Sequence, residues 1–146
     1  MDQIIEEGEQ LVVIDDDAVI CAIVQRHLRD TAWQVACFTS ESEGLAYLAC
    51  HEPDVLLVDI RMPRIDGDQI LEELAAGNRL APSTRVLVSS SVQPPRAIWQ
   101  SFEKFAATFI LKDVVASRPD FLAALGGSAG PGRDLTAERS LKRISR

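Results

Sequence analysis

Acidic, hydroxyl and basic side chains follow four short apolar runs that lie far apart in this sequence. They are Asp15 and Asp16 after LVVI, Asp59 after VLLV, Ser89 after VLV, and Lys112 after FIL. If these runs are parallel strands of one sheet, their carboxyl ends meet at one edge, where open α/β folds place their sites. Three carboxylates, a hydroxyl and an ammonium group would then lie together.

Such a group of carboxylates needs a cation, because unit charges about 4 Å apart repel by about 4 kcal/mol at an effective dielectric of about 20. Oxygen ligands without His or Cys favour a hard ion, so we expect Mg²⁺ or Mn²⁺. A carboxylate beside such an ion can attack phosphorus and form an aspartyl phosphate. Lys112 would neutralise charge on the transferring group while the Ser89 hydroxyl donates a hydrogen bond. The pattern predicts a phosphoryl acceptor.

Apolar runs alternate with helical patterns along the chain, which indicates the elements that position these side chains. We expect strands at 11–14, 33–38, 55–58, 86–88 and 109–111, and helices at 18–30, 42–50, 68–76, 95–105 and 114–125. Runs that are apolar on both faces are typical of buried parallel strands. Repeated strand–helix units with right-handed crossovers predict an α/β fold, a five-stranded parallel sheet in a doubly wound (βα)5 sandwich.

Composition supports a globular protein and excludes several classes. The 146 residues suit one domain, and 47% hydrophobic with 25% charged residues excludes a disordered chain. A net charge of −7 argues against direct nucleic-acid binding. No apolar run is long enough to span a membrane, and the acidic first ten residues are unlike a secretion signal. We therefore expect a cytoplasmic protein without a membrane partner.

The cysteines and histidines show no metal-ligand spacing. Cys21, Cys37 and Cys50 are an odd number of cysteines, so we expect reduced thiols that serve as packing residues. His27 and His51 fall on expected helices without acidic or cysteine neighbours, and we expect both at the surface or half-buried. None of these residues is a candidate site residue.

The glycine-rich stretch GGSAGPG divides the chain into two parts. We expect a folded domain at 9–125 and a flexible linker with a basic tail at 126–146. From residue 133 onward, five Lys or Arg residues stand against two acids. The tail is interpreted as a linker, a partner-binding segment or the start of a further region.

Over about residues 10–125, the sequence resembles the receiver domain of two-component response regulators. The resemblance is carried by the motifs LVVIDDD, VDIRMPRIDG, VLVSS and FILK. It implies the flavodoxin-like strand order 2-1-3-4-5. It also implies that Asp59 is the phosphoacceptor and that Asp16 binds the metal ion directly, with Asp15 acting through water. The backbone carbonyl of Arg61 would be a further ligand.

The same resemblance implies a switch and partners. Ser89 and Lys112 match the hydroxyl and lysine of the family, and Phe109 matches its switch aromatic residue. The implied donor is a histidine kinase or a histidine phosphotransfer protein. Phosphorylation would repack the face formed by the fourth helix, fifth strand and fifth helix, which would contact an output domain, a target protein or a second copy in a homodimer. The sequence identifies neither the kinase nor the output.

Two residues depart from the family pattern. Asp113 follows Lys112 where the family usually has proline, and Phe105 stands where a glycine usually closes the fourth helix. Both positions belong to the output side, so these changes bear on the switch rather than on the acceptor.

Simpler interpretations of single residues remain open. Asp16 and Asp17 could be helix N-caps alone. Ser89 could bond to local backbone, Lys112 could be a solvated lysine, and Phe109 could be an ordinary core residue.

Two other functions are possible for such a domain. A degenerate receiver would bind a partner without being phosphorylated, as a protein–protein interaction module. A phosphohydrolase with an aspartate nucleophile generally has a second carboxylate two residues later, but Arg61 stands two residues after Asp59. We therefore expect a receiver rather than an enzyme.

Overall fold

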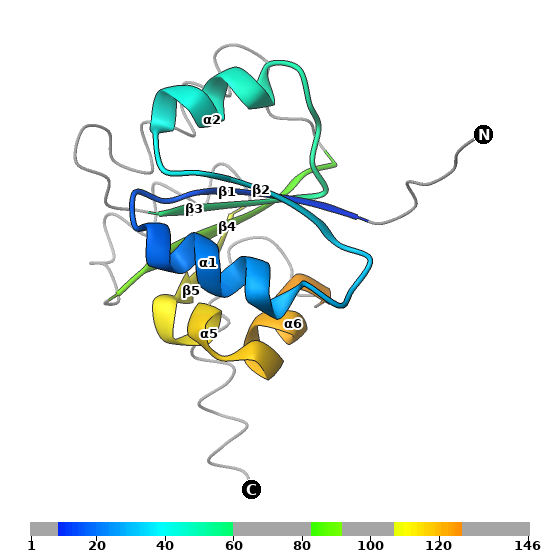
Figure 1. Cartoon of the computed structure of the whole chain (residues 1–146), viewed down its shortest axis with the longest axis vertical. Helices are drawn as coiled ribbons and strands as arrows, with labels where there is room; N and C mark the ends of the chain where they lie inside the picture. Colours follow the sequence, from blue (N-terminus) through cyan, green and yellow to red (C-terminus); the bar gives the residue numbers. More distant parts are fainter. Residues whose placement is uncertain (1–8, 60–82, 92–106, 127–146) are drawn as a thin grey trace, which may run out of the picture.

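Five parallel strands form one sheet in the computed structural model, which describes residues 9–59, 83–91 and 107–126 (Figure 1). The strand order is β2-β1-β3-β4-β5, as the resemblance implied. The strands are β1 (Gln10–Ile14), β2 (Gln34–Phe38), β3 (Val55–Asp59), β4 (Arg85–Ser90) and β5 (Thr108–Leu111). The doubly wound α/β class predicted from the apolar runs is confirmed.

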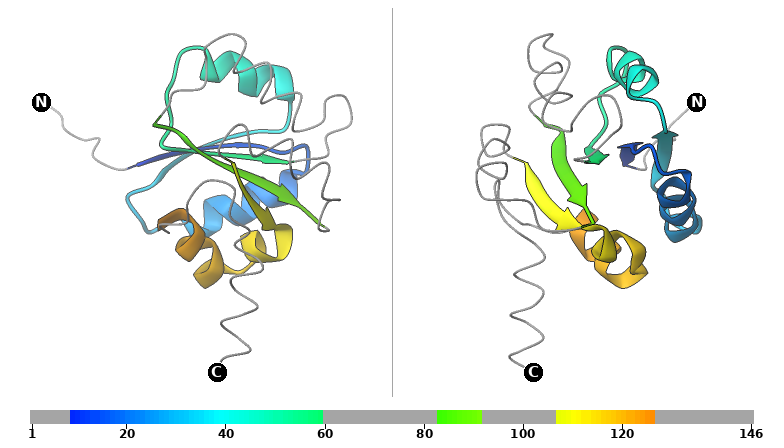
Figure 2. Two further views of the ribbon diagram at one scale, coloured as in Figure 1. Left: turned by 180° about the vertical axis from the view of Figure 1, so that it is seen from behind. Right: turned by 90° about the vertical axis from the view of Figure 1, so that its left-hand side faces the viewer.

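Helices cover both faces of the sheet (Figure 2). On one face lie α1 (Ala18–His27), α5 (Lys112–Ala116) and α6 (Arg118–Gly126), and on the other lies α2 (Glu41–Leu48). Residues of β1 alternate between the two cores, since Leu11 and Val13 face α1 whereas Val12 and Ile14 face α2. This burial on both faces explains why the run is apolar throughout.

Gly44 allows α2 to lie close to the sheet. A Cβ atom at this position would lie 2.6 Å from Cδ1 and 2.7 Å from Cγ1 of Ile14, which is closer than two carbon atoms approach each other. Ile14 is fully buried at the end of β1 and cannot move aside into solvent. The glycine therefore sets the distance between α2 and β1.

The expected single helix at 114–125 is instead two short helices, and Pro119 explains the break. Ser117 between α5 and α6 is extended, with φ −95° and ψ 115°. Proline has no N–H to donate to the carbonyl four residues earlier, and its ring clashes with that carbonyl. The carbonyl in question belongs to Val115, and His27 Nε2 lies 2.9 Å from its oxygen. Because a carbonyl only accepts, His27 donates this bond in place of the missing amide.

Several expectations about single residues were wrong. His27 is buried rather than at the surface, because it donates to Val115 and packs against Phe121 with ring centroids 5.7 Å apart. Cys50 is exposed rather than packed, since α2 ends before it at Leu48. Lys112 directly follows β5, as expected, and is the first residue of α5.

Other expectations fall outside the described residues. These are the helices at 68–76 and 95–105, Phe105, the Arg61 carbonyl and residues 127–146 of the expected linker and tail. Gly126 itself is the last residue of α6. Among the described residues, no helix has the length and apolar character that a membrane span requires.

Candidate functional site

Three carboxylates meet at the carboxyl edge of the sheet. Asp15 follows β1 directly and Asp59 ends β3, and these two strands are neighbours in which Ile14 pairs with Val58. One carboxylate oxygen each of Asp15, Asp16 and Asp59 lies within 4.8 Å of the others. Asp15 and Asp59 are buried whereas Asp16 is exposed, so the cluster opens to solvent on one side. The predicted convergence of these acids is therefore present.

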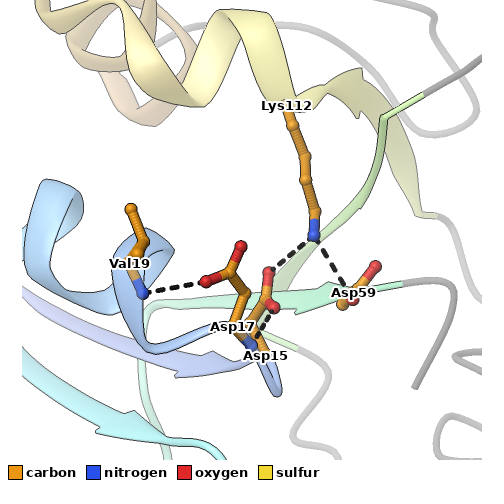
Figure 3. Close-up of polar contacts among 5 residues, drawn as sticks. All are labelled: Asp15, Asp17, Val19, Asp59 and Lys112. Carbon is orange, nitrogen blue, oxygen red and sulfur yellow. Dashed lines mark hydrogen bonds and ion pairs between the residues drawn. The ribbon is translucent and has the colours of Figure 1, made fainter. Parts of the chain in front are cut away.

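Lys112 reaches this cluster from the start of α5 (Figure 3). Its Nζ lies 3.3 Å from Asp15 Oδ2 and 3.4 Å from Asp59 Oδ2, to which it donates a hydrogen bond. The lysine side chain is 20% exposed, so its ammonium group stays close to solvent while it contacts two buried acids. The ammonium group therefore belongs to the site and is not an isolated surface charge.

The loop between β1 and α1 holds Asp15 in place. The backbone N–H of Asp17 donates to Asp15 Oδ1 over 2.9 Å, and the Asp15 N–H donates to the Phe38 carbonyl over 3.0 Å. Asp17 turns away and accepts from the Val19 N–H over 2.9 Å, as the N-cap of α1 (Figure 3). The N-cap interpretation thus holds for Asp17, whereas Asp15 and Asp16 are available to the cluster.

Burial and charge shift the proton affinities of the site. Burial raises the pKa of Asp15 to about 6 from its ordinary value of 3.8, and repulsion by Asp59 adds to the rise, while the Asp17 N–H and Lys112 oppose it. Burial also disfavours the charge of Lys112, but attraction to Asp15 and Asp59 outweighs it and raises the pKa of the lysine. Two buried acids therefore share the ammonium group of Lys112.

The donor set fits a hard divalent cation. Asp15 Oδ2 is buried, and its ion pair with Lys112 is accompanied by no hydrogen bond of good geometry within the described part of the chain. Such an oxygen is costly to bury unless something completes its contacts. Carboxylate oxygens are the ligands that Mg²⁺ and Mn²⁺ prefer. Asp15, Asp16 and Asp59 could therefore hold one such ion.

Ser89 and Phe109 lie beside the acids on the next two strands. Ser89 on β4 pairs directly with Asp59 on β3, and it is buried. Phe109 on β5 pairs with Val88, which precedes Ser89, and its ring is buried as well. The register thus places the hydroxyl next to the expected acceptor and the aromatic residue one strand further. Asp113, next to Lys112, is exposed.

One buried acid was not singled out from the sequence. Glu41 begins α2, just after the carboxyl end of β2, and its Oε2 is buried with no hydrogen-bond partner among the described residues. Its first-turn position in a helix that follows a strand end is a sequence signal that could have drawn attention to it. Glu41 is not one of the three clustered acids, and it is not a candidate ligand of the metal ion.

Comparison with known proteins identifies the class. A match to the response regulator receiver domain family covers residues 11–124. The chain belongs to this family, and the fold and the clustered acids described above agree with that assignment.

Individual relatives are bacterial regulators. The chain is 38% identical over 94 residues to the probable transcriptional regulatory protein NarL of Mycobacterium tuberculosis, which covers 64% of this chain and 41% of that protein. It is 31% identical over 106 residues to the DNA-binding transcriptional regulator NtrC of Salmonella typhimurium, covering 71% and 23% of the two proteins. The chain therefore spans less than half the length of these curated relatives.

Solved receiver domains share the fold. The signal receiver domain of the putative response regulator NarL from Mycobacterium tuberculosis aligns with a TM-score of 0.67 and 30% identity, over 82% of this chain and 94% of that one. A CheY-like receiver domain protein from Methanospirillum hungatei aligns with a TM-score of 0.71 and 21% identity, over 82% and 91%. The second likeness concerns the fold alone.

Proposed function

We propose that this receiver domain accepts a phosphoryl group on Asp59 from the phosphohistidine of a histidine kinase or a histidine phosphotransfer protein. The observation that carries the proposal is the convergence of Asp59 with two further acids and one ammonium group at a single sheet edge. Two buried acids beside one ammonium group, with Asp15 Oδ2 lacking a hydrogen bond to the described residues, cost stability, and this supports a functional role for the cluster. Membership of the receiver family supports a signalling role rather than turnover of a substrate.

Asp15, Asp16 and Asp59 would hold Mg²⁺ or Mn²⁺, with Asp15 acting through water and the Arg61 carbonyl as a further ligand. When bound, the ion neutralises charge on the phosphoryl oxygens. Asp16 is the exposed member of the three and therefore faces the side from which a donor protein can approach.

In the transfer step, a carboxylate oxygen of Asp59 attacks phosphorus and the P–N bond to the donor histidine breaks. The imidazole leaves with the electron pair of that bond, and a new P–O bond makes the acyl phosphate. Lys112 already lies 3.4 Å from Asp59 Oδ2, so its ammonium group can pair with the incoming charge without a large movement. The Ser89 hydroxyl, opposite Asp59 in the register, would donate to a phosphoryl oxygen.

Ser89 and Phe109 would then change conformation in response to phosphorylation of Asp59. If Ser89 turns towards the phosphoryl group, it vacates space next to β5, and the buried Phe109 ring can move into it. Such a two-state element is biased by one new charge. The repacked surface would bind an output domain, a target protein or a second copy of the chain.

The proposal includes the organisation of the chain. The receiver extends to the end of α6 at Gly126, and residues 127–146 act as a linker with a basic tail. NarL and NtrC are transcriptional regulators by name, which supports a role in the control of transcription for this chain. The net charge of −7 argues against DNA contact by the domain itself. The free cysteines fit a reducing cytoplasm.

Phosphorylation can be tested with the full chain, Mg²⁺ and a small phosphodonor such as phosphoramidate, followed by intact mass measurement. We expect the mass of one phosphoryl group to be added, and this label to be lost in Asp59→Asn and in excess EDTA. Asp54→Asn is the matched control, because Asp54 flanks the same strand at its opposite end and should keep the label. Stoichiometric label on Asp59→Asn would show that the nucleophile is wrong. No label on the unmodified chain would favour the degenerate receiver that only binds a partner.

A further inference from the structure

Two of the three cysteines lie against each other between α1 and the sheet. Cys21 is in the first half of α1, and Cys37 is on β2, which is an edge strand of the described sheet. The Cys37 thiol donates to the Cys21 carbonyl, with Sγ 3.9 Å from the oxygen. Both residues belong to the core between α1 and the sheet. All three cysteines are free, so the pair is present as thiols.

The Cys37 sulfur thus lies against the backbone of Cys21, and each thiol changes the proton affinity of the other. Interaction with the Cys37 thiol lowers the pKa of the Cys21 thiol, against the opposing effects of burial and the charges of Asp15 and Asp17. The same interaction, together with burial, raises the pKa of the Cys37 thiol. A disulfide needs two cysteines whose backbones lie close together, and the Cys37 sulfur is 3.9 Å from the Cys21 carbonyl oxygen. The thiolate is the reactive form of a cysteine, and the lowered pKa of Cys21 makes it the more readily ionised of the two.

Access to the pair differs between its members. Cys21 is buried, whereas Cys37 is half-buried on β2. A large reagent would reach Cys21 poorly, but a molecule the size of hydrogen peroxide needs little space. Cys50 is fully accessible but contacts neither of the other thiols among the described residues. The exposed cysteine, Cys50, is therefore not one of the two cysteines that lie together. An internal disulfide depends on the proximity of two cysteines rather than on exposure.

We propose that Cys21 and Cys37 are a modification site at which hydrogen peroxide produces an intramolecular disulfide that joins α1 to β2. The Cys21 thiolate attacks one peroxide oxygen, the O–O bond breaks, and the departing hydroxide takes a proton and leaves as water. Cys21 is then a sulfenic acid. The sulfur of Cys37 attacks that of Cys21, the S–OH bond breaks, and a second water leaves with the Cys37 proton. Two thiols are oxidised and one peroxide is reduced to two waters.

The location of the disulfide gives it a consequence for the fold. α1 begins at the N-cap Asp17, two residues after Asp15, and β2 ends at Phe38, whose carbonyl accepts the Asp15 N–H. The bond would therefore tie together the two elements that fix the Asp15 backbone. In a reducing compartment such disulfides are transient and serve redox sensing. The proposal does not depend on phosphoryl transfer, so either can fail alone.

The test uses the full folded chain, fully reduced and then treated with increasing hydrogen peroxide. The reaction is stopped by denaturation with an alkylating agent, and peptides are mapped without reduction. We expect a peptide pair linked through Cys21 and Cys37, formed at peroxide concentrations that leave Cys50 alkylated, and released by dithiothreitol. The proposal is overturned if Cys50 is oxidised while Cys21 and Cys37 are still recovered as alkylated thiols. Disulfides that join either residue to Cys50 would also overturn it.

Variants test the order of attack. In Cys37→Ser the second step is blocked, so we expect a sulfenic acid on Cys21 that dimedone traps. Cys50→Ser is the matched control and should form the Cys21–Cys37 linkage as the unmodified chain does. Dimedone on residue 50 alone in Cys37→Ser would show that Cys21 is not the attacking thiol. The peptide map of the unmodified chain does not rely on any variant and decides the proposal even if Cys37→Ser is poorly folded.

Discussion

Polar side chains at the two ends of the parallel strands differ in how well their hydrogen-bonding groups are paired. At the carboxyl edge, the Lys112 ammonium group lies between Asp15 and Asp59, and Asp15 Oδ2 has no hydrogen bond of good geometry within the part of the chain that the structure describes. At the amino edge, Asp54, Thr84 and Arg85 each bond to backbone groups.

The contacts at the amino edge are close and join distant parts of the chain. The Gln10 N–H donates to Asp54 Oδ2 over 2.7 Å, and Thr84 Oγ1 donates to the Pro53 carbonyl over 2.6 Å. The Arg85 guanidinium donates to the carbonyls of Leu125 and Ala124 at the end of α6, over 2.5 Å and 2.8 Å. Cations near a helix C-terminus and satisfied buried groups stabilise a fold. The amino edge thus contributes stability, while the carboxyl edge retains charge that costs folding free energy and serves chemistry.

Among these variants, we expect the largest change in stability for Asp15→Asn at the carboxyl edge, measured in EDTA at pH 7. The pKa of Asp15 is raised to about 6 from 3.8, so its ionisation favours the unfolded chain. We expect Asp15→Asn to increase the free energy of unfolding by about 2–3 kcal/mol, since one pKa unit is worth about 1.4 kcal/mol. The same substitution should greatly weaken Mg²⁺ binding.

The sign of this effect fixes its pH dependence. A raised pKa means that Asp15 favours folding below pH 3.8, and that this contribution is lost as the pH rises through about 6. The advantage of Asp15→Asn should therefore disappear by about pH 4. Urea unfolding at pH 7 and pH 4 measures the difference in stability between the variant and the unmodified chain. If the variant is less stable than the unmodified chain at pH 7, the Asp15 carboxylate does not destabilise the fold.

Arg85→Met tests the opposite edge. Methionine keeps the apolar stem but removes the two donors to the end of α6. We expect the free energy of unfolding to fall by about 1–2 kcal/mol, with phosphoryl labelling of Asp59 unchanged. Loss of labelling without loss of stability would reverse the roles of the two edges.

Metal affinity provides a test at the carboxyl edge in the unmodified chain. Protonation of Asp15 at a pKa of about 6 competes with the cation. We expect Mn²⁺ to bind about tenfold more weakly at pH 5 than at pH 7, because most of the Asp15 carboxylates are then protonated. Calorimetric titration measures the affinity, and Asp15→Asn should flatten this dependence. An affinity that is constant across this range would show that Asp15 does not act on the ion.

The smallest effect is expected for Thr84→Val at the amino edge. The shape of the side chain is preserved and only the hydroxyl that donates to Pro53 is lost. We expect a loss of about 1 kcal/mol in unfolding free energy, since the carbonyl of Pro53 is left without that donor. Thermal unfolding at pH 7 measures it. An unchanged midpoint would mean that the amino edge owes its stability to Arg85 rather than to all its polar contacts.

Much of the fold could be predicted because each signal was local. The runs LVVI and VLLV are apolar at every position, a pattern typical of parallel strands that are buried on both faces of a sheet, and they form the neighbouring strands β1 and β3. Parallel strands then place Asp15 and Asp59 at one edge, so the candidate site followed from the strand ends alone. The strand order came from the family resemblance, since periodicity does not specify which strands are neighbours.

The remaining features depend on contacts between residues far apart in the sequence. Pro119 was visible, yet the division of the last helix also needed a donor for the Val115 carbonyl, and that donor is His27, which lies 88 positions earlier. His27 was therefore expected at the surface or half-buried, because no residue near it in the sequence is a partner. Likewise, no spacing rule relates Cys21 to Cys37, because their contact arises only when α1 folds onto β2.

Gly44 limits which substitutions this receiver can tolerate over evolutionary time. The missing side chain lets α2 rest on Ile14, and Ile14 immediately precedes Asp15 in the chain. Even one methyl group would have to push on a fully buried isoleucine, and the displacement would pass along the backbone to the neighbouring acid. Gly44 is uncharged and lies on the face of the sheet opposite α1, yet it affects the position of the Asp15 carboxylate.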